Sequence, residues 1–134
     1  GIANEIEINE NGISHPLYVD KDRKFNSPAF NFDEVVKLPR NGICLASNKI
    51  NEIQSLYFEI NNTKVWGLQY HPEITYEKMI SLIQFRKDSL IEKRKVFKNS
   101  SDVEKHIDFI KKEISVENKL NRMMELKNWL DQLK

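Results

Sequence analysis

The amino-acid sequence predicts an α/β protein in which a β-rich first half is followed by a helical second half. The composition changes near residue 75: before it, short apolar runs are separated by Asn, Gly and Pro, and after it neither Gly nor Pro occurs. Apolar residues alternate in the first half and recur at helical spacing in the second. A chain of 134 residues is long enough for one hydrophobic core. We therefore predict a β-rich part over 1–74 and a helical tail over 75–134 that packs on the same domain.

Five runs of β-type residues divide the first half. They are EIEI (5–8), DEVVKL (33–38), GICLAS (42–47), IQSLYFEI (53–60) and KVWGLQYH (64–71). In the fourth run, Leu56 and Phe58 alternate with more polar neighbours, as expected of a half-buried strand. The sequence NNT (61–63) separates the fourth and fifth runs and predicts a hairpin. LPRNG (38–42) predicts a turn, because proline fixes φ and Asn-Gly tolerates positive φ.

Three helices are expected in the second half. Thr75 is placed to cap the first, and Ser101 and Glu104 have the spacing of a capping box in the second. Trp129 lies beside the stripe of the third. The three stripes, each interpreted as core packing, are Met79, Ile83, Arg86 and Leu90; Val103, Ile107, Ile110 and Ile114; and Leu120, Met123, Leu130 and Leu133.

Composition and charge exclude several classes of protein. The net charge of +1 gives no reason to expect nucleic acid or an anionic membrane as a partner. No apolar run approaches the ~18 residues of a membrane-spanning helix, and the acidic start lacks the layout of a signal peptide. Because Cys44 is the single cysteine, an internal disulfide is impossible, and the cytoplasm is the expected location.

Neither a metal nor a cofactor is predicted. His15, His71 and His106 are scattered, and none has zinc-ligand spacing to a cysteine or another histidine. With four glycines in the chain, no glycine-rich phosphate loop is present.

The stretch WGLQYHPE (66–73) carries the candidate site. Pro72 favours an extended conformation at His71, and side chains two residues apart on an extended chain point to the same side. His71 and Glu73 are therefore expected to hydrogen-bond. A carboxylate on one ring nitrogen fixes the tautomer and leaves the other nitrogen as a base. The alternative is a purely structural pair, in which His71 ends a strand and Glu73 places a charge at a helix start.

The segment VWGLQYHPE resembles the terminal motif of class I glutamine amidotransferases, in which a hydrophobic strand leads into Gly-x-Gln-[Phe/Tyr]-His-Pro-Glu. DEVVKLP, followed by LASN, resembles the Asp-x-Val-x-x-Leu-Pro segment and Leu-Ala strand of that family. IQSLYFEINNTKVWG resembles the hairpin that leads into the catalytic strand. The helical tail, which ends in MELKNWL, resembles the tails of amidotransferases related to the glutaminase part of GMP synthase.

This resemblance implies a flavodoxin-like α/β fold, of which the chain is an incomplete C-terminal part. It also implies that His71 is the general base and that Glu73 orients it. In the family, a cysteine attacks the side-chain amide of glutamine, ammonia leaves, and water hydrolyses the glutamyl thioester.

The chain departs from the family in lacking a recognisable nucleophile. Cys44 lies in GICLA, but no helical pattern follows it as a nucleophile elbow requires, so we expect a buried strand thiol. The expected partners are glutamine as substrate and a missing N-terminal half, or a partner subunit, that supplies the cysteine. The start at Gly1 without methionine fits a trimmed piece, and a fragment and a split gene remain open. Because half a sheet leaves an unpaired edge, self-association is expected.

A second departure is Asn31, where relatives often carry histidine. Asparagine does not titrate near neutral pH, so the role of that histidine is lost or altered here. Two alternatives to a glutaminase stay open: a non-catalytic interaction or regulatory module that keeps the scaffold, and a γ-glutamyl peptidase that uses the same residues. The sequence does not identify the acceptor of the ammonia.

Overall fold

The computed structural model describes all 134 residues and divides them into two compact units. The sheet unit comprises residues 2–73 and 118–134, and the helical unit comprises Gly1 and residues 74–117. The sheet unit holds all five strands and the helical unit the longest helices, so the α/β class is confirmed. Packing of the helical tail on the same domain stays a prediction.

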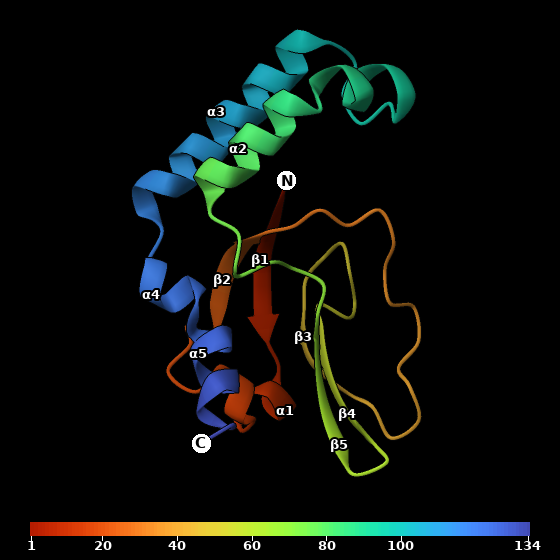
Figure 1. Ribbon diagram of the computed structural model, residues 1–134, viewed down its shortest axis with the longest axis vertical. Coiled ribbons are helices and arrows are strands. Elements are labelled where there is room, and N and C mark those ends of the chain that lie inside the picture. Colours follow the sequence, from red (N-terminus) through yellow and green to blue (C-terminus); the bar gives the residue numbers. More distant parts are fainter. The chain divides into compact units, whose positions relative to one another are not determined.

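The sheet unit is built around one antiparallel sheet (Figure 1). Its strands are β1 (Ile2–Ile8), β2 (Lys24–Pro28), β3 (Ile43–Ser47), β4 (Ser55–Ile60) and β5 (Thr63–Leu68), in the spatial order β2-β1-β3-β4-β5. All four neighbouring pairs are antiparallel. Beyond β5, the amide of His71 donates to the carbonyl of Pro28 at the end of β2, with a nitrogen–oxygen distance of 2.7 Å. The two outer strands thus approach each other at one end, and the sheet curls.

The hairpin between β4 and β5 is confirmed. Ile60 pairs with Thr63, which leaves a loop of Asn61 and Asn62 with φ angles of 50° and 62°. Two successive residues with positive φ form the type I′ turn that matches the twist of a hairpin. Asparagine tolerates this conformation better than most residues because its short polar side chain hydrogen-bonds locally. The predicted turn at residues 38–42 is also present, with the amide of Gly42 donating to the carbonyl of Pro39 at 2.8 Å.

One predicted strand is wrong, and one strand of the structure was not predicted. Residues 33–38 form no strand, and the side chain of Val36 is 83% exposed. Strand-forming residues are stabilised by cross-strand neighbours, and this segment pairs with none. The sequence also gave no signal for β2, because KFNSP has one large apolar residue and ends in proline. Pro28 is tolerated because β2 is an outer strand.

The core of the sheet unit is one cluster of side chains from β1, β2, β3, η1 and the residue Tyr70. Its buried members are Ala3, Ile6, Ile8, Leu17, Tyr18, Phe25, Leu45, Ala46 and Tyr70. The short helices α1 (Glu10–Ile13) and η1 (Pro16–Tyr18) follow β1, and α1 packs against β3. A Cβ on Gly12 would lie 2.2 Å from the carbonyl oxygen of Leu45. Only glycine allows this close approach of helix and strand.

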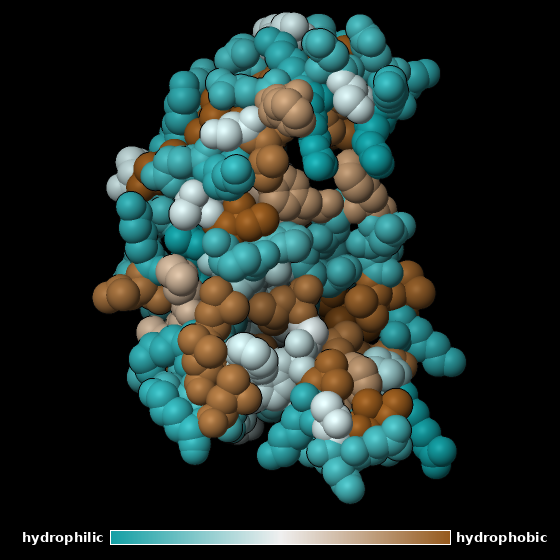
Figure 2. Space-filling view, viewed as in Figure 1, coloured by the Kyte–Doolittle hydropathy of each residue, from teal (hydrophilic) through white to brown (hydrophobic).

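The C-terminal helices of the sheet unit correct the third predicted stripe. These are α4 (Lys119–Arg122) and α5 (Met124–Asp131), of which α5 packs against η1. The apolar residues assigned to the core are instead exposed, and Figure 2 shows such apolar surface among the polar atoms. The exposed residues are Leu120, Met123, Trp129, Leu130 and Leu133. The side chains buried in their place are Arg122, Glu125 and Asn128, because the surface beneath offers carbonyl, amine and hydroxyl groups that need polar partners.

The helical unit contains α2 (Tyr76–Phe85), the π-helical turn η2 (Ser89–Lys93) and α3 (Ser100–Val116). The predicted cap of α2 is confirmed, since the hydroxyl of Thr75 accepts from the amide of Lys78 at 3.1 Å. The predicted capping box is wrong: α3 begins earlier, and Asn99 caps it by accepting from the amide of Asp102.

The helices α2 and α3 pack on each other through two predicted stripes, whose buried members are Met79, Ile83, Val103, Ile107 and Ile110. The first stripe stops at Ile83, because α2 ends at Phe85 and the side chain of Arg86 is exposed. None of the helices combines the length and apolar character needed to cross a bilayer.

Candidate active site

His71 and Glu73 lie just beyond the end of β5, and their side chains meet. His71 Nδ1 lies 2.7 Å from Glu73 Oε1, which confirms the predicted hydrogen bond. The pair is accessible to solvent, with 38% of the histidine side chain and 51% of the glutamate side chain exposed. A half-exposed pair of this kind is open to a substrate from outside the chain.

The backbone and ring of His71 are both held in place. Its amide donates to the carbonyl of Pro28 at 2.7 Å, and its ring meets that of Phe30 in an edge-to-face arrangement, with ring centroids 5.7 Å apart at 63°. Two residues earlier, the amide of Gln69 donates to the carbonyl of Gln54 at 2.8 Å. The imidazole is therefore presented from an anchored stretch of chain.

The contact with Glu73 determines which ring nitrogen is available. A carboxylate accepts a proton donor, so it favours the tautomer with the proton on Nδ1. Nε2 then carries a lone pair and can take a proton from a nucleophile or give one to a leaving group. This geometry is the one that a base and its orienting group, two of the three parts of a nucleophilic triad, require.

Cys44 does not belong to this pair. It lies in β3, opposite Leu56 of β4, and β4 separates β3 from β5. Its Sγ is 3.4 Å from the carbonyl oxygen of Ala46 and 3.5 Å from that of Glu52. Burial raises the pKa of the half-buried thiol, which disfavours the nucleophilic thiolate. The prediction that Cys44 lies in a strand and not in an elbow is confirmed, but the residue is half-buried and not buried as predicted.

Asn31 and Asp33 lie in the loop that follows β2. Both side chains are exposed, and the carbonyl of Asp33 accepts from Gln69 Nε2 at 3.4 Å. The loop thus reaches the strand that leads to His71, but neither side chain is hydrogen-bonded to the His71–Glu73 pair.

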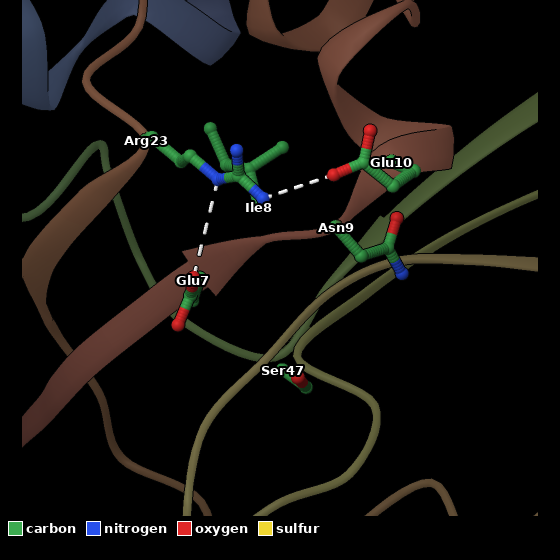
Figure 3. Close-up of a pocket in the computed structure, with 6 residues that line it drawn as sticks. All are labelled: Glu7, Ile8, Asn9, Glu10, Arg23 and Ser47. Carbon is green, nitrogen blue, oxygen red and sulfur yellow. Dashed lines mark hydrogen bonds and ion pairs between the residues drawn. The ribbon is translucent and has the colours of Figure 1, made fainter.

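The sheet unit also has hollows that the pair does not line. The hollow in Figure 3 has a volume of about 290 Å³ and is lined by Glu7, Ile8, Asn9, Glu10, Arg23 and Ser47. Arg23 points to both glutamates, with nitrogen–oxygen distances of 3.0 Å to Glu10 and 3.9 Å to Glu7. Its charges are thus paired within the chain. A smaller hollow of about 80 Å³ lies near Val35, Gly67 and Gln69. Nowhere do three or more His, Cys, Asp or Glu side chains gather as metal ligands.

A buried polar network behind the candidate site was not predicted. The hydroxyl of Tyr70 donates to Glu125 Oε1 at 2.7 Å and is hydrogen-bonded to that of Tyr18 at 2.8 Å. Tyr18 is also hydrogen-bonded to Ser55 Oγ at 2.7 Å. Lys21 Nζ lies 3.0 Å from Glu125 Oε2, and both side chains are only 1% exposed.

Burial governs the protonation of this network. It raises the pKa of Glu125, although Lys21 acts in the opposite direction. It lowers the pKa of Lys21, which Glu125 in turn opposes. The pKa of Tyr70 is held well above its usual value, so its hydroxyl stays protonated. A spacing of three residues between Arg122, Glu125 and Asn128 was the one signal in the sequence that these polar side chains share a helix face.

Comparison with known proteins gives one curated relative. No family model matches the chain. The sequence is 27% identical to a γ-glutamyl-L-1-hydroxyisopropylamide hydrolase from Pseudomonas sp, over 151 aligned positions that cover 98% of this chain and 49% of the relative. The chain thus spans about half the length of the relative it matches. This similarity supports the broad class of glutamine-amidotransferase-like proteins that the His-Pro-Glu motif indicated.

Proposed function

We propose that this chain is the C-terminal part of a glutamine-amidotransferase-like hydrolase that cleaves γ-glutamyl amides, with His71 as general base and Glu73 as its orienting group. The observation that carries the proposal is the 2.7 Å contact between His71 Nδ1 and Glu73 Oε1, which leaves Nε2 available at an exposed strand end. The relative whose name describes a γ-glutamyl amide hydrolase supports the same chemistry.

The reaction follows from this geometry. His71 Nε2 takes the proton of a cysteine thiol supplied from outside these 134 residues, and the thiolate attacks the γ-carbonyl carbon. The carbon–nitrogen bond breaks as the imidazolium gives its proton to the departing nitrogen. Water, deprotonated by the same imidazole, then attacks the thioester carbonyl carbon. The carbon–sulfur bond breaks as the imidazolium returns its proton to the cysteine, and glutamate is released. Glu73 stabilises the imidazolium in both steps by accepting its Nδ1 proton in a hydrogen bond.

Glutamine is the simplest substrate that this chemistry admits, with ammonia as the leaving group. The named relative acts on an amide with a larger amine, so the γ-glutamyl peptidase alternative gains support beside the glutaminase. In either case the group recognised is a γ-glutamyl amide. The missing N-terminal half, or a partner subunit, completes a flavodoxin-like, GMP synthase-like domain and provides the cysteine and the oxyanion hole.

A non-catalytic role is the second candidate. The observation that favours it is the placement of Cys44, whose thiol faces the carbonyls of Ala46 and Glu52. Such a chain would keep the His71–Glu73 pair as a structural relic and act as an interaction or regulatory module.

An assay of amide hydrolysis separates the two candidates. The 134-residue chain alone and the complete protein that carries this sequence are each given glutamine and γ-glutamyl-p-nitroanilide. We expect no turnover by the chain alone, because an isolated base without a thiolate and an oxyanion hole is a weak catalyst, and turnover by the complete protein. Absence of turnover by the complete protein on both substrates would support the non-catalytic role.

A further inference from the structure

The two residues that flank His71 are both held by one segment at the far end of the chain. The hydroxyl of Tyr70 donates to Glu125 Oε1 at 2.7 Å, and Arg122 Nη1 donates to the carbonyl oxygen of Pro72. Arg122 and Glu125 are both buried, and both belong to the α4–α5 segment of the sheet unit. His71 therefore projects from a backbone that is tied immediately before and immediately after it.

The hydrogen bond from Arg122 is made to the residue that connects His71 and Glu73. Pro72 is the only residue between His71 and Glu73, so the orientation of its carbonyl fixes the peptide plane that leads into Glu73. A hydrogen bond from a charged guanidinium is roughly twice as strong as one between neutral groups. It holds that plane more firmly than a water molecule or an ordinary amide would.

The buried ion pair of Lys21 and Glu125 fixes the helix that carries Arg122. Lys21 Nζ donates to the carbonyl of Asn121 at 2.6 Å as well as to Glu125, so the last turn of α4 is fixed next to Arg122. Lys21 also lies over the ring of Phe25, with the nitrogen 4.1 Å from the centroid. The helix that carries Arg122 is thereby anchored to the strand β2.

We propose that Arg122, supported by Glu125, is a positioning residue for the His71–Glu73 pair. By fixing the Pro72–Glu73 peptide, Arg122 keeps Glu73 Oε1 within hydrogen-bond distance of His71 Nδ1 and so favours the tautomer with the proton on Nδ1. The expected effect of Arg122 on catalysis rests on the proposed function. Its expected effect on the His71–Glu73 contact does not, because that contact exists without substrate.

Asn128 provides a matched control for a merely structural role. It is buried on the same side of the segment as Arg122, and its side-chain amide donates to the carbonyls of Leu17 at 2.9 Å and Val19 at 2.8 Å. Neither carbonyl adjoins His71. Removal of the Asn128 amide thus also breaks buried polar contacts between this segment and the sheet unit, but leaves Pro72 untouched.

The experiment compares Arg122→Met with Asn128→Leu by ¹⁵N NMR of histidine-labelled protein, with the His71 resonances assigned from their loss in His71→Gln. In the parent protein and in Asn128→Leu, we expect the Nδ1-protonated tautomer of His71. In Arg122→Met, the resonances should shift toward those of a free imidazole, in which Nε2–H predominates. Arg122→Lys keeps the charge but loses the planar guanidinium, and it should shift the His71 resonances in the same direction. If Arg122→Met does not fold, Arg122→Lys takes its place in the comparison.

Kinetics of the complete protein give the second readout. If the base is mispositioned, kcat for γ-glutamyl-p-nitroanilide should fall by about 10- to 100-fold in Arg122→Met with little change in KM, since small displacements of a catalytic group cost rates of this order. Asn128→Leu should keep the parent kcat once it is corrected for the folded fraction. His71 resonances unchanged in Arg122→Met, or shifted equally in Asn128→Leu, would overturn the positioning role. Absence of turnover in every protein, together with the expected NMR shifts, would refute only the proposed function.

Discussion

The sheet unit contains two acid–base pairs of similar length in opposite surroundings. His71 and Glu73 meet at 2.7 Å with about two-fifths and one-half of their side chains exposed, whereas Lys21 and Glu125 meet at 3.0 Å with 1% exposed. Charges at an accessible strand end can exchange protons with a substrate. Charges in the interior must satisfy each other, because an unpaired ion there is costly. The comparison separates a pair suited to chemistry from a pair suited to holding structure.

The largest expected effect is on catalysis by the exposed pair. In the complete protein, His71→Ala should lower turnover of γ-glutamyl amides by ~10²–10⁴-fold, the range typical of a general acid–base group. Glu73→Gln should cost less, because in the proposed mechanism Glu73 orients and stabilises the ring without itself transferring the proton. Steady-state kinetics of both variants give the ranking. A larger loss in Glu73→Gln than in His71→Ala would reverse the roles assigned to the pair.

The His71→Ala variant should keep nearly the unfolding free energy of the parent protein. Substitution of a half-exposed residue usually changes stability by no more than about 0.5 kcal/mol, so His71→Ala should unfold at nearly the same urea concentration as the parent. A loss of several kcal/mol would mean that the exposed pair is structural.

The buried pair should behave in the opposite way. Lys21→Met leaves the Glu125 carboxylate unpaired in the interior and should lower the unfolding free energy by about 3–5 kcal/mol at neutral pH. The double variant Lys21→Met/Glu125→Gln removes both charges and should recover most of the loss, since the glutamine amide still accepts from Tyr70. Urea unfolding at pH 7 measures both. The exposed pair of Lys24 and Glu7 is the control, with an expected loss of about 0–1 kcal/mol for Glu7→Gln.

A smaller effect is expected from pH. Because burial raises the pKa of Glu125 in the folded protein, the folded state holds its proton to higher pH than the unfolded chain does. The stability that this proton contributes is present below the ordinary glutamate pKa, near 4.5, and is lost as the pH rises through the folded value. The free energy of unfolding of the parent, relative to that of Glu125→Gln, should therefore decrease as the pH rises from 4 towards neutrality. A relative stability that rises over this interval would contradict the direction of the shift.

The smallest effect is expected at Cys44. Cys44→Ser should change turnover hardly at all, because the thiol contacts the backbone carbonyls of Ala46 and Glu52, and β4 separates its strand β3 from β5. Kinetics of the complete protein and circular dichroism check this. If Cys44→Ser were more damaging than His71→Ala in a folded protein, the site would have been placed wrongly.

The parts of the molecule that the sequence predicted are those set by local chemistry. The hairpin follows from two asparagines between alternating runs, and the contact of His71 with Glu73 follows from their spacing around Pro72. Both depend on residues within a few positions of one another, so spacing and turn preferences suffice to find them.

The parts that the sequence did not predict depend on distant partners. Residues 33–38 have the composition of a strand but no neighbouring strand to pair with. Arg122 and Asn128 are buried because they donate hydrogen bonds to the carbonyls of Pro72 and Leu17. Those carbonyls are distant in the sequence, so no local pattern predicts the contacts. The stripe of leucines and methionines on the same helices therefore predicted burial for a helix face that is exposed.

The most direct test of the central claim is to identify the acylated residue. The complete protein is mixed with a γ-glutamyl amide, quenched rapidly and digested, and the γ-glutamyl adduct is located by mass spectrometry. We expect a thioester on a cysteine outside residues 1–134, forming at least 10²-fold more slowly in His71→Ala, as loss of a general base implies. An adduct on Cys44, or one that forms at the parent rate without His71, would contradict the account.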